Sequence, residues 1–138
     1  MANRLFHFAA LANFAIALLH VAIPFIGMRG YIYFGTAELA MLAARGSPIP
    51  AIATWFLASI FTIFGSYCLS GAGIIRRLPL LTPVLLFVGG IYTLRGLILI
   101  LDILRYLHGE TFPLRQTVFS AVALSIGVMI LVGIRKQG

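Results

Sequence analysis

The sequence predicts an all-α integral membrane protein: a four-transmembrane-helix bundle with a short interfacial or re-entrant helix between the first two spans. The first observation is composition. Of the 138 residues, 62% are hydrophobic and 9% are charged, which is more apolar surface than a soluble domain of this length can bury. The second is that the apolar residues form four runs of roughly 20 residues or more, the length that crosses a bilayer as a helix: about 5–26, 50–74, 80–105 and 114–134. We expect residues 1–138 to form a single transmembrane domain.

The first span carries polar residues among small ones. Asn13 and His20 stand at heptad spacing, which places both on one face of a helix. Pro24 follows four residues after His20 and removes the backbone hydrogen bond that the His20 carbonyl would otherwise accept. We therefore expect a kink beside His20.

A short helix is expected at about 36–45, in the longest link between spans. Thr36 is a suitable N-cap and Glu38 falls in the first turn, while Gly46 and Pro48 are stop signals. A helix of about ten residues cannot cross a hydrocarbon core that is about 30 Å thick. We expect it to lie on the outer membrane surface or to fold back as a lid.

The remaining spans differ in charge. The second has no charged residue. The third follows Pro79 and Pro83, both tolerated in a first helical turn, and contains Arg95 near its middle. The fourth begins after Pro113.

The charge balance indicates a membrane surface rather than nucleic acid. Ten basic and three acidic residues give a net charge of +7, and most basic residues lie at the ends of the apolar runs, where they meet lipid headgroups. Arg76 and Arg77 occupy a very short loop between spans, and positive residues in short loops favour the cytoplasmic side. We expect a plasma or inner membrane, both termini in the cytoplasm, the lipid bilayer as a partner, and no nucleic-acid binding.

Arg95 most needs an explanation, because its guanidinium cannot lose its charge and lies within an apolar run. At a rise of about 1.5 Å per residue, it falls within roughly one turn of the membrane midplane. The same estimate predicts a polar layer near this depth, formed by His20, Ser59, Tyr92, Arg95 and Ser120, with Asn13 below it. The predicted ligand-binding residues are Arg95, His20, Tyr92, Asn13, Ser59 and Ser120.

The three acidic residues leave Arg95 without an obvious partner. Glu38, Asp102 and Glu110 all lie toward the outer end of the predicted bundle. Asp102 shares a helical face with Arg95 but lies about 10 Å along the axis, just out of direct contact. An arginine without a carboxylate suits an anionic headgroup, a carboxylate ligand or an acidic residue of another subunit. The structural alternative is a guanidinium that snorkels or bonds to nearby carbonyls.

Three functions fit these residues. The first is binding or transport of an amphipathic anionic or lipid-like small molecule in an intramembrane site centred on Arg95. The second is an integral membrane enzyme that acts on a lipophilic substrate through His20 with Glu38 and Asp102, with or without a metal. The third is a structural or assembly subunit of a homo-oligomer or larger membrane complex, in which a partner supplies the carboxylate for Arg95.

The sequence indicates no particular cofactor, and we do not expect a metal site. Imidazole and carboxylate groups that could hold zinc, iron or manganese lie toward the outer end, but none has the spacing of a helix-borne metal motif. The structural alternative for His20 is a packed histidine bonded to a serine or a carbonyl beside the kink. The metal candidates are His20, Glu38, Asp102 and His108.

The size and four-span layout are similar to small multidrug transporters and to the microsomal glutathione-transferase group, but the residues that define those groups are missing. The former have a glutamate in the first span, and none is present here. The latter carry an Arg, Asn and Glu signature on the second span, which here contains no charged residue. The residues therefore assign the chain to neither group.

Overall fold

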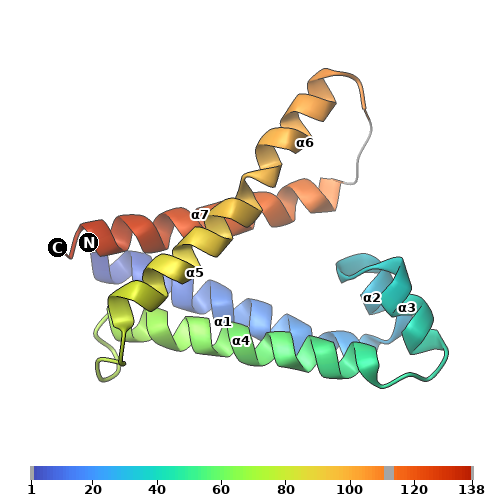
Figure 1. The fold of residues 1–138 in the computed structure, drawn as a ribbon, viewed down its shortest axis with the longest axis horizontal. Helices are drawn as coiled ribbons and strands as arrows, with labels where there is room; N and C mark the ends of the chain where they lie inside the picture. The colour runs from blue at the N-terminus through green and yellow to red at the C-terminus, as the bar shows by residue number, and fades with distance from the viewer. Residues whose placement is uncertain (1, 111–113, 138) are drawn as a thin grey trace. The chain divides into compact units, whose positions relative to one another are not determined.

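The computed structural model describes residues 2–110 and 114–137, and the regular elements in this part of the chain are helices (Figure 1). Four stretches are long and apolar enough to cross a membrane: Asn3–Ile26, Ile49–Gly71, Leu81–Leu107 and Leu114–Arg135. The predicted all-α class and its four apolar helical spans are confirmed. The elements are α1 (Ala2–Ile26), α2 (Met28–Phe34), α3 (Ala37–Ala44), α4 (Ile49–Gly71), α5 (Leu81–Gly96), α6 (Ile98–Leu107) and α7 (Leu114–Arg135).

The chain divides by its internal packing into two units. One unit consists of residues 11–65, and the other of residues 1–10 and 66–138. Both α1 and α4 therefore contribute to each unit, whereas α2 and α3 belong to the first and α5, α6 and α7 to the second.

In unit 11–65, α1 and α4 run antiparallel and are joined by aromatic side chains. The His20 ring lies against Phe61, with ring centroids 4.9 Å apart. Phe14 packs where Gly65 has no side chain, since a Cβ there would lie 2.9 Å from the Phe14 ring. The two contacts advance in opposite directions along α1 and α4, which defines the antiparallel register.

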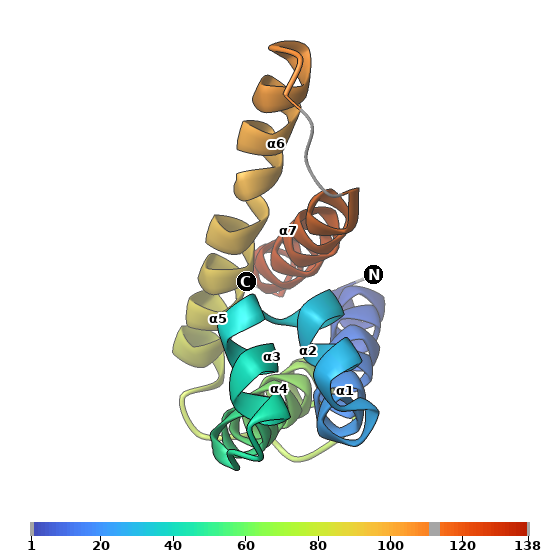
Figure 2. The ribbon, with the colours of Figure 1, turned by 90° about the vertical axis from the view of Figure 1, so that its right-hand side faces the viewer.

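The link between α1 and α4 forms a pair of short helices. The chain turns at Gly27, whose φ of +74° favours glycine, and then forms α2, which packs on α3. Figures 1 and 2 both show these two helices side by side. A small core of Ile23, Tyr31 and Ala40 fills their contact with the end of α1.

The predicted helix at 36–45 is confirmed as α3, and its cap is the predicted one. The Thr36 hydroxyl accepts a hydrogen bond from the Leu39 backbone N–H at 3.3 Å. This bond satisfies one of the backbone donors that a helix N-terminus leaves without a partner. Helix α2 was not predicted.

In the second unit, α5 and α7 form the most extensive helix contact. Glycines permit the close approach of the two backbones: a Cβ on Gly96 would lie 2.5 Å from the Leu124 Cα, and one on Gly127 would lie 2.5 Å from the Thr93 Oγ1. Small residues at such crossings are the usual means by which membrane helices pack. The two pairs define an antiparallel register of α5 against α7.

The third apolar run contains a break at Leu97, between α5 and α6. Gly96 is a poor helix former and packs directly on α7. At the break, the Leu97 N–H donates to the Thr93 carbonyl at 2.9 Å, and the Leu97 carbonyl accepts from the Ile100 N–H at 3.0 Å, which is a tighter, three-residue turn. Beyond it α6 leads away from α7 in both views (Figures 1 and 2).

Candidate functional site

Arg95 and Ser120 come together where α5 crosses α7. An Nη1–H of the Arg95 guanidinium donates to the Ser120 Oγ at 3.0 Å. Ser120 is completely buried, whereas Arg95 remains exposed at the surface. Within the described part of the chain, Ser120 is the hydrogen-bond partner of Arg95, and no carboxylate lies within ion-pair distance of it.

The helix register explains why these two side chains meet. Gly96, the residue after Arg95, lets the Leu124 backbone approach directly. Ser120 lies one turn before Leu124 on α7, so it faces the part of α5 that carries Arg95. A larger residue at position 96 would separate the helices and move the hydroxyl away from the guanidinium.

Tyr92 belongs to the same unit and lies one turn before Arg95. It is 6% exposed and therefore buried. Of the predicted ligand-binding residues, Arg95, Ser120 and Tyr92 thus belong to one unit.

Asp102 is buried but is not a partner of Arg95. It is 4% exposed and is the one buried residue of α6. Its Oδ2 has no hydrogen-bond partner in the described part of the chain, and the same is true of the buried Thr117 Oγ1 on α7. The described chain has one ion pair, between the exposed Arg105 and Glu110 at 3.9 Å.

The other predicted ligand-binding residues belong to unit 11–65. The His20 Nδ1 lies 2.8 Å from the Ile16 carbonyl, and a carbonyl can only accept, so Nδ1 carries the proton in this bond. Asn13 is fully buried. Ser59 is exposed, and its hydroxyl donates to the Trp55 carbonyl at 3.1 Å. A common layer of these residues with Arg95 stays a prediction.

Ser59 lines a shallow apolar groove on this unit. The groove has a volume of about 610 Å³. One of its polar side chains, Thr62, donates its hydroxyl to the Ala58 carbonyl at 2.8 Å. It is lined by Val21, Phe25, Trp55, Ala58, Ser59, Thr62 and Ile63.

The metal candidates do not gather into a site within either unit. In the described residues of each unit, no three His, Cys, Asp or Glu side chains come together. His108 is exposed, with its Nδ1 bonded to the Leu104 carbonyl at 2.7 Å. Glu38 is exposed as well, and hydrogen bonds from its own backbone N–H and from the Thr36 hydroxyl lower the pKa of Glu38. His20 and Glu38 lie in one unit and Asp102 and His108 in the other.

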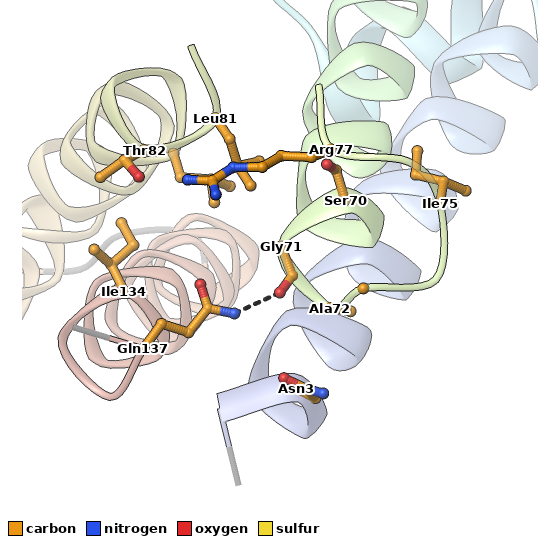
Figure 3. A pocket seen from close by; sticks show the side chains of 12 residues that line it. Asn3, Ser70, Gly71, Ala72, Ile75, Arg77, Leu81, Thr82, Ile134 and Gln137 are labelled. Carbon is orange, nitrogen blue, oxygen red and sulfur yellow. Dashed lines mark hydrogen bonds between the residues drawn. The ribbon is translucent and has the colours of Figure 1, made fainter. Parts of the chain in front are cut away.

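A cavity that the sequence reasoning missed lies in the second unit, near the loop between α4 and α5. Its volume is about 610 Å³, and Arg77 is the one charged residue among the lining residues that the structure describes (Figure 3). In the sequence, the Arg76–Arg77 pair indicates membrane topology and not a cavity. The remaining lining residues come from four separate segments, so no local pattern marks them.

Comparisons of this chain with protein-family models, with curated proteins and with solved structures find no match.

Proposed function

We propose that this chain is a membrane protein that binds an anionic amphipathic molecule, such as a fatty acid or an acidic lipid, through the Arg95 guanidinium. One observation carries the proposal. Ser120 orients the guanidinium at 3.0 Å, and no described residue offers it a carboxylate. A guanidinium has five N–H donors, so the bond to Ser120 leaves most of them for the carboxylate or phosphate of a ligand.

The surroundings of Arg95 suit the apolar part of such a ligand. Ile91 is 41% exposed and lies four residues before Arg95, the spacing of neighbours on one helical face, while Leu94 and Ile98, close to Arg95 in the sequence, are 69% and 40% exposed. A head group at Arg95 would leave a hydrocarbon tail in contact with these side chains. Apolar walls with a few placed polar groups are the usual composition of a ligand site.

The proposal includes the arrangement in the membrane. The four spans form a bundle in a plasma or inner membrane, with both termini in the cytoplasm and α3 at the outer surface. Tyr92 and Ser120, which belong to the same unit as Arg95, lie near the ligand's polar end, and His20, Asn13 and Ser59 stay predicted ligand-binding residues. Binding at this depth is the step that transport of an amphiphile would require.

The test measures retention of a defined anionic amphiphile. Purified protein is titrated with oleate and the bound state is counted by native mass spectrometry, for the wild type and for Arg95→Gln. Loss of a charge-assisted contact to a carboxylate should weaken binding by about tenfold or more. Ser120→Ala should weaken it less, since the charge remains and only its orientation is lost.

Arg105→Gln is the matched control. Arg105 is also a span arginine, but it is exposed and paired with Glu110, so its loss should leave oleate binding unchanged. Equal binding of oleate by the wild type and Arg95→Gln would refute the site. A parallel loss in Arg105→Gln would indicate unspecific attraction of anions.

A second function, an assembly subunit, is favoured by the same exposed position of Arg95. A carboxylate from another chain could reach the guanidinium from that side. In that case Arg95→Met changes the oligomer mass in a mild detergent, whereas a ligand site leaves the mass unchanged and loses only the bound amphiphile.

A further inference from the structure

We infer a second anion site, separate from Arg95, in which the cavity beside Arg77 holds the head group of an anionic phospholipid. The cavity has a volume of about 610 Å³. It lies among the first turn of α1, the end of α4, the beginning of α5 and the end of α7 (Figure 3). All of these segments belong to one packing unit.

The cavity lining is amphipathic, and the one charged side chain among the described lining residues is positive. Ile75, Leu81, Leu85 and Ile134 provide apolar surface, and the described lining residues include no Asp or Glu. In Figure 3 the Arg77 side chain extends past Ser70 toward Leu81 and Thr82. The polar lining residues that accompany Arg77 are Asn3, Ser70, Thr82 and Gln137.

Ser70 holds the segment that carries Arg77. Its hydroxyl donates to the Arg76 carbonyl at 3.1 Å and accepts from the Leu78 N–H at 2.9 Å. The residues on both sides of Arg77 are therefore bonded to one side chain, which is itself 6% exposed. The backbone of Arg77 is fixed while its guanidinium stays available for a ligand.

The opposite wall is fixed as well. The Gln137 Nε2 donates to the Gly71 carbonyl at 2.6 Å, which ties the end of α7 to the end of α4 (Figure 3). This bond closes one side of the cavity. The cavity is thus built by contacts within the fold and not by a single mobile side chain.

The chemistry favours a phospholipid over a free anion. A guanidinium matches a phosphate with two parallel hydrogen bonds, while the apolar lining residues would have no partner in a free phosphate. The cavity lies at the ends of the apolar helices, the part of a membrane protein where headgroups and basic residues meet. Arg76 directly precedes Arg77, and Arg135 and Lys136 stand between the lining residues Ile134 and Gln137, so the neighbours of the lining residues add positive charge.

The experiment compares two neighbouring arginines. Full-length protein in detergent is titrated with phosphatidylglycerol or phosphatidylcholine, and bound lipid is counted by native mass spectrometry. We expect the wild type to prefer phosphatidylglycerol, Arg77→Gln to bind it about tenfold more weakly, and Arg76→Gln, which does not line the cavity, to change binding less than about twofold. The affinity of Arg77→Lys for phosphatidylglycerol should lie between those of the wild type and Arg77→Gln. A lysine keeps the positive charge but cannot donate the two parallel hydrogen bonds of a guanidinium.

Other outcomes would overturn the inference. Equal losses in Arg76→Gln and Arg77→Gln would indicate diffuse surface attraction without a built site. Displacement of the lipid by millimolar inorganic phosphate would indicate a free-anion site. Circular dichroism confirms that each variant is folded, and Arg95→Gln should retain phosphatidylglycerol at the Arg77 site, so the failure of one site is distinguishable from the failure of the other.

Discussion

At the scale of single residues, many polar groups in the helices bond to their own backbone. Three histidine rings lie with Nδ1 at hydrogen-bond distance from the carbonyl four residues earlier. The distances are 2.6 Å for His7, 2.8 Å for His20 and 2.7 Å for His108. The Thr93 and Ser125 hydroxyls likewise donate to the carbonyls four residues earlier, at 2.7 and 2.8 Å. Such bonds satisfy a polar group inside a helix without a partner helix. The cross-helix bond of Arg95 to Ser120 differs from them, which is why we centre the function there.

For His20, this bond also limits the chemistry that the ring could perform. With the proton on Nδ1, a neutral ring has only Nε2 as a base. An enzyme that used His20 would therefore have to bind its substrate on the Nε2 side. The arrangement equally matches the structural alternative, a histidine bonded to a carbonyl and packed on Phe61.

The first residue-scale prediction concerns Thr36. Thr36→Ala removes one of the hydrogen bonds that lower the pKa of Glu38, so that pKa should rise toward its ordinary value in a carboxyl titration followed by NMR. Because the folded-state pKa is lowered, the stabilisation of the ionised carboxylate is present at neutral pH and is lost as the pH falls through that pKa. Thr36→Ser keeps the hydroxyl and should leave the titration unchanged, whereas an unshifted pKa in Thr36→Ala would show that the hydroxyl has no influence.

At the scale of elements, the packing of α5 on α7 depends on where glycine stands. Gly96 and Gly127 leave no space for a Cβ, while Gly90, on the same helix as Gly96, has nothing within 4 Å of its Cβ position. Glycine in a membrane helix is thus a packing residue at some positions and only a weak helix former at others. The contact that positions Ser120 beside Arg95 depends on a glycine that acts as a packing residue.

This difference predicts opposite effects of the same substitution in one helix. Gly96→Ala forces its new methyl against the Leu124 backbone and should destabilise the protein by about 1–3 kcal/mol, the usual range for overpacking. Gly90→Ala should be neutral or slightly stabilising, because alanine is the better helix former. Thermal unfolding in one detergent compares the two variants. Equal melting temperatures would mean that the close approach at Gly96 does not hold the helices together.

The break at Leu97 separates two helices of different character. Helix α5 packs closely on α7, whereas α6 is an apolar helix that exposes its hydrophobic side chains and buries Asp102. A soluble protein would have the opposite pattern, with the apolar residues inside. For a helix in lipid this arrangement is expected, because the surrounding solvent is apolar and the charged group turns toward the protein.

At the scale of the whole molecule, the charges are distributed unevenly along the sequence. Arg4, Arg76, Arg77, Arg135 and Lys136 flank the termini and the α4–α5 loop. The other links, or the residues near them, hold four basic residues, Arg29, Arg45, Arg105 and Arg115, and the three acidic residues, Glu38, Asp102 and Glu110. With four spans, the termini and the α4–α5 loop share one side. The Arg76–Arg77 pair lies in a short loop, where the positive-inside rule favours the cytoplasm, so the proposed lipid site at Arg77 would face the inner leaflet.

Cysteine labelling tests this topology. The one natural cysteine, Cys68, is buried, so it should react weakly with a polar maleimide and serve as a low background. In intact cells, R45C should be labelled from outside and K136C only after permeabilisation. The reverse pattern would overturn the proposed orientation and move the Arg77 cavity to the outer leaflet, and labelling of both from outside would contradict an even number of spans.

The sequence by itself determined the helical class, the four apolar spans and the capped helix after Thr36, because each of these depends on local chemistry: the length of an apolar run, a capping hydroxyl, a stop signal. It also identified Arg95 as a charge in need of a partner. Helix α2 and the break at Leu97 escaped prediction, since the former has no cap signal and the latter depends on packing against α7.

Only the tertiary structure decided that Ser120 is the partner of Arg95 and that Arg77 lines a cavity. The register between two helices is established by close contacts such as Gly96 on Leu124, and neither residue reveals its partner in its own sequence neighbourhood. The cavity likewise combines segments that are distant in the chain. Helix formation is a property of neighbouring residues, whereas the meeting of two helices depends on the shape of both surfaces at once.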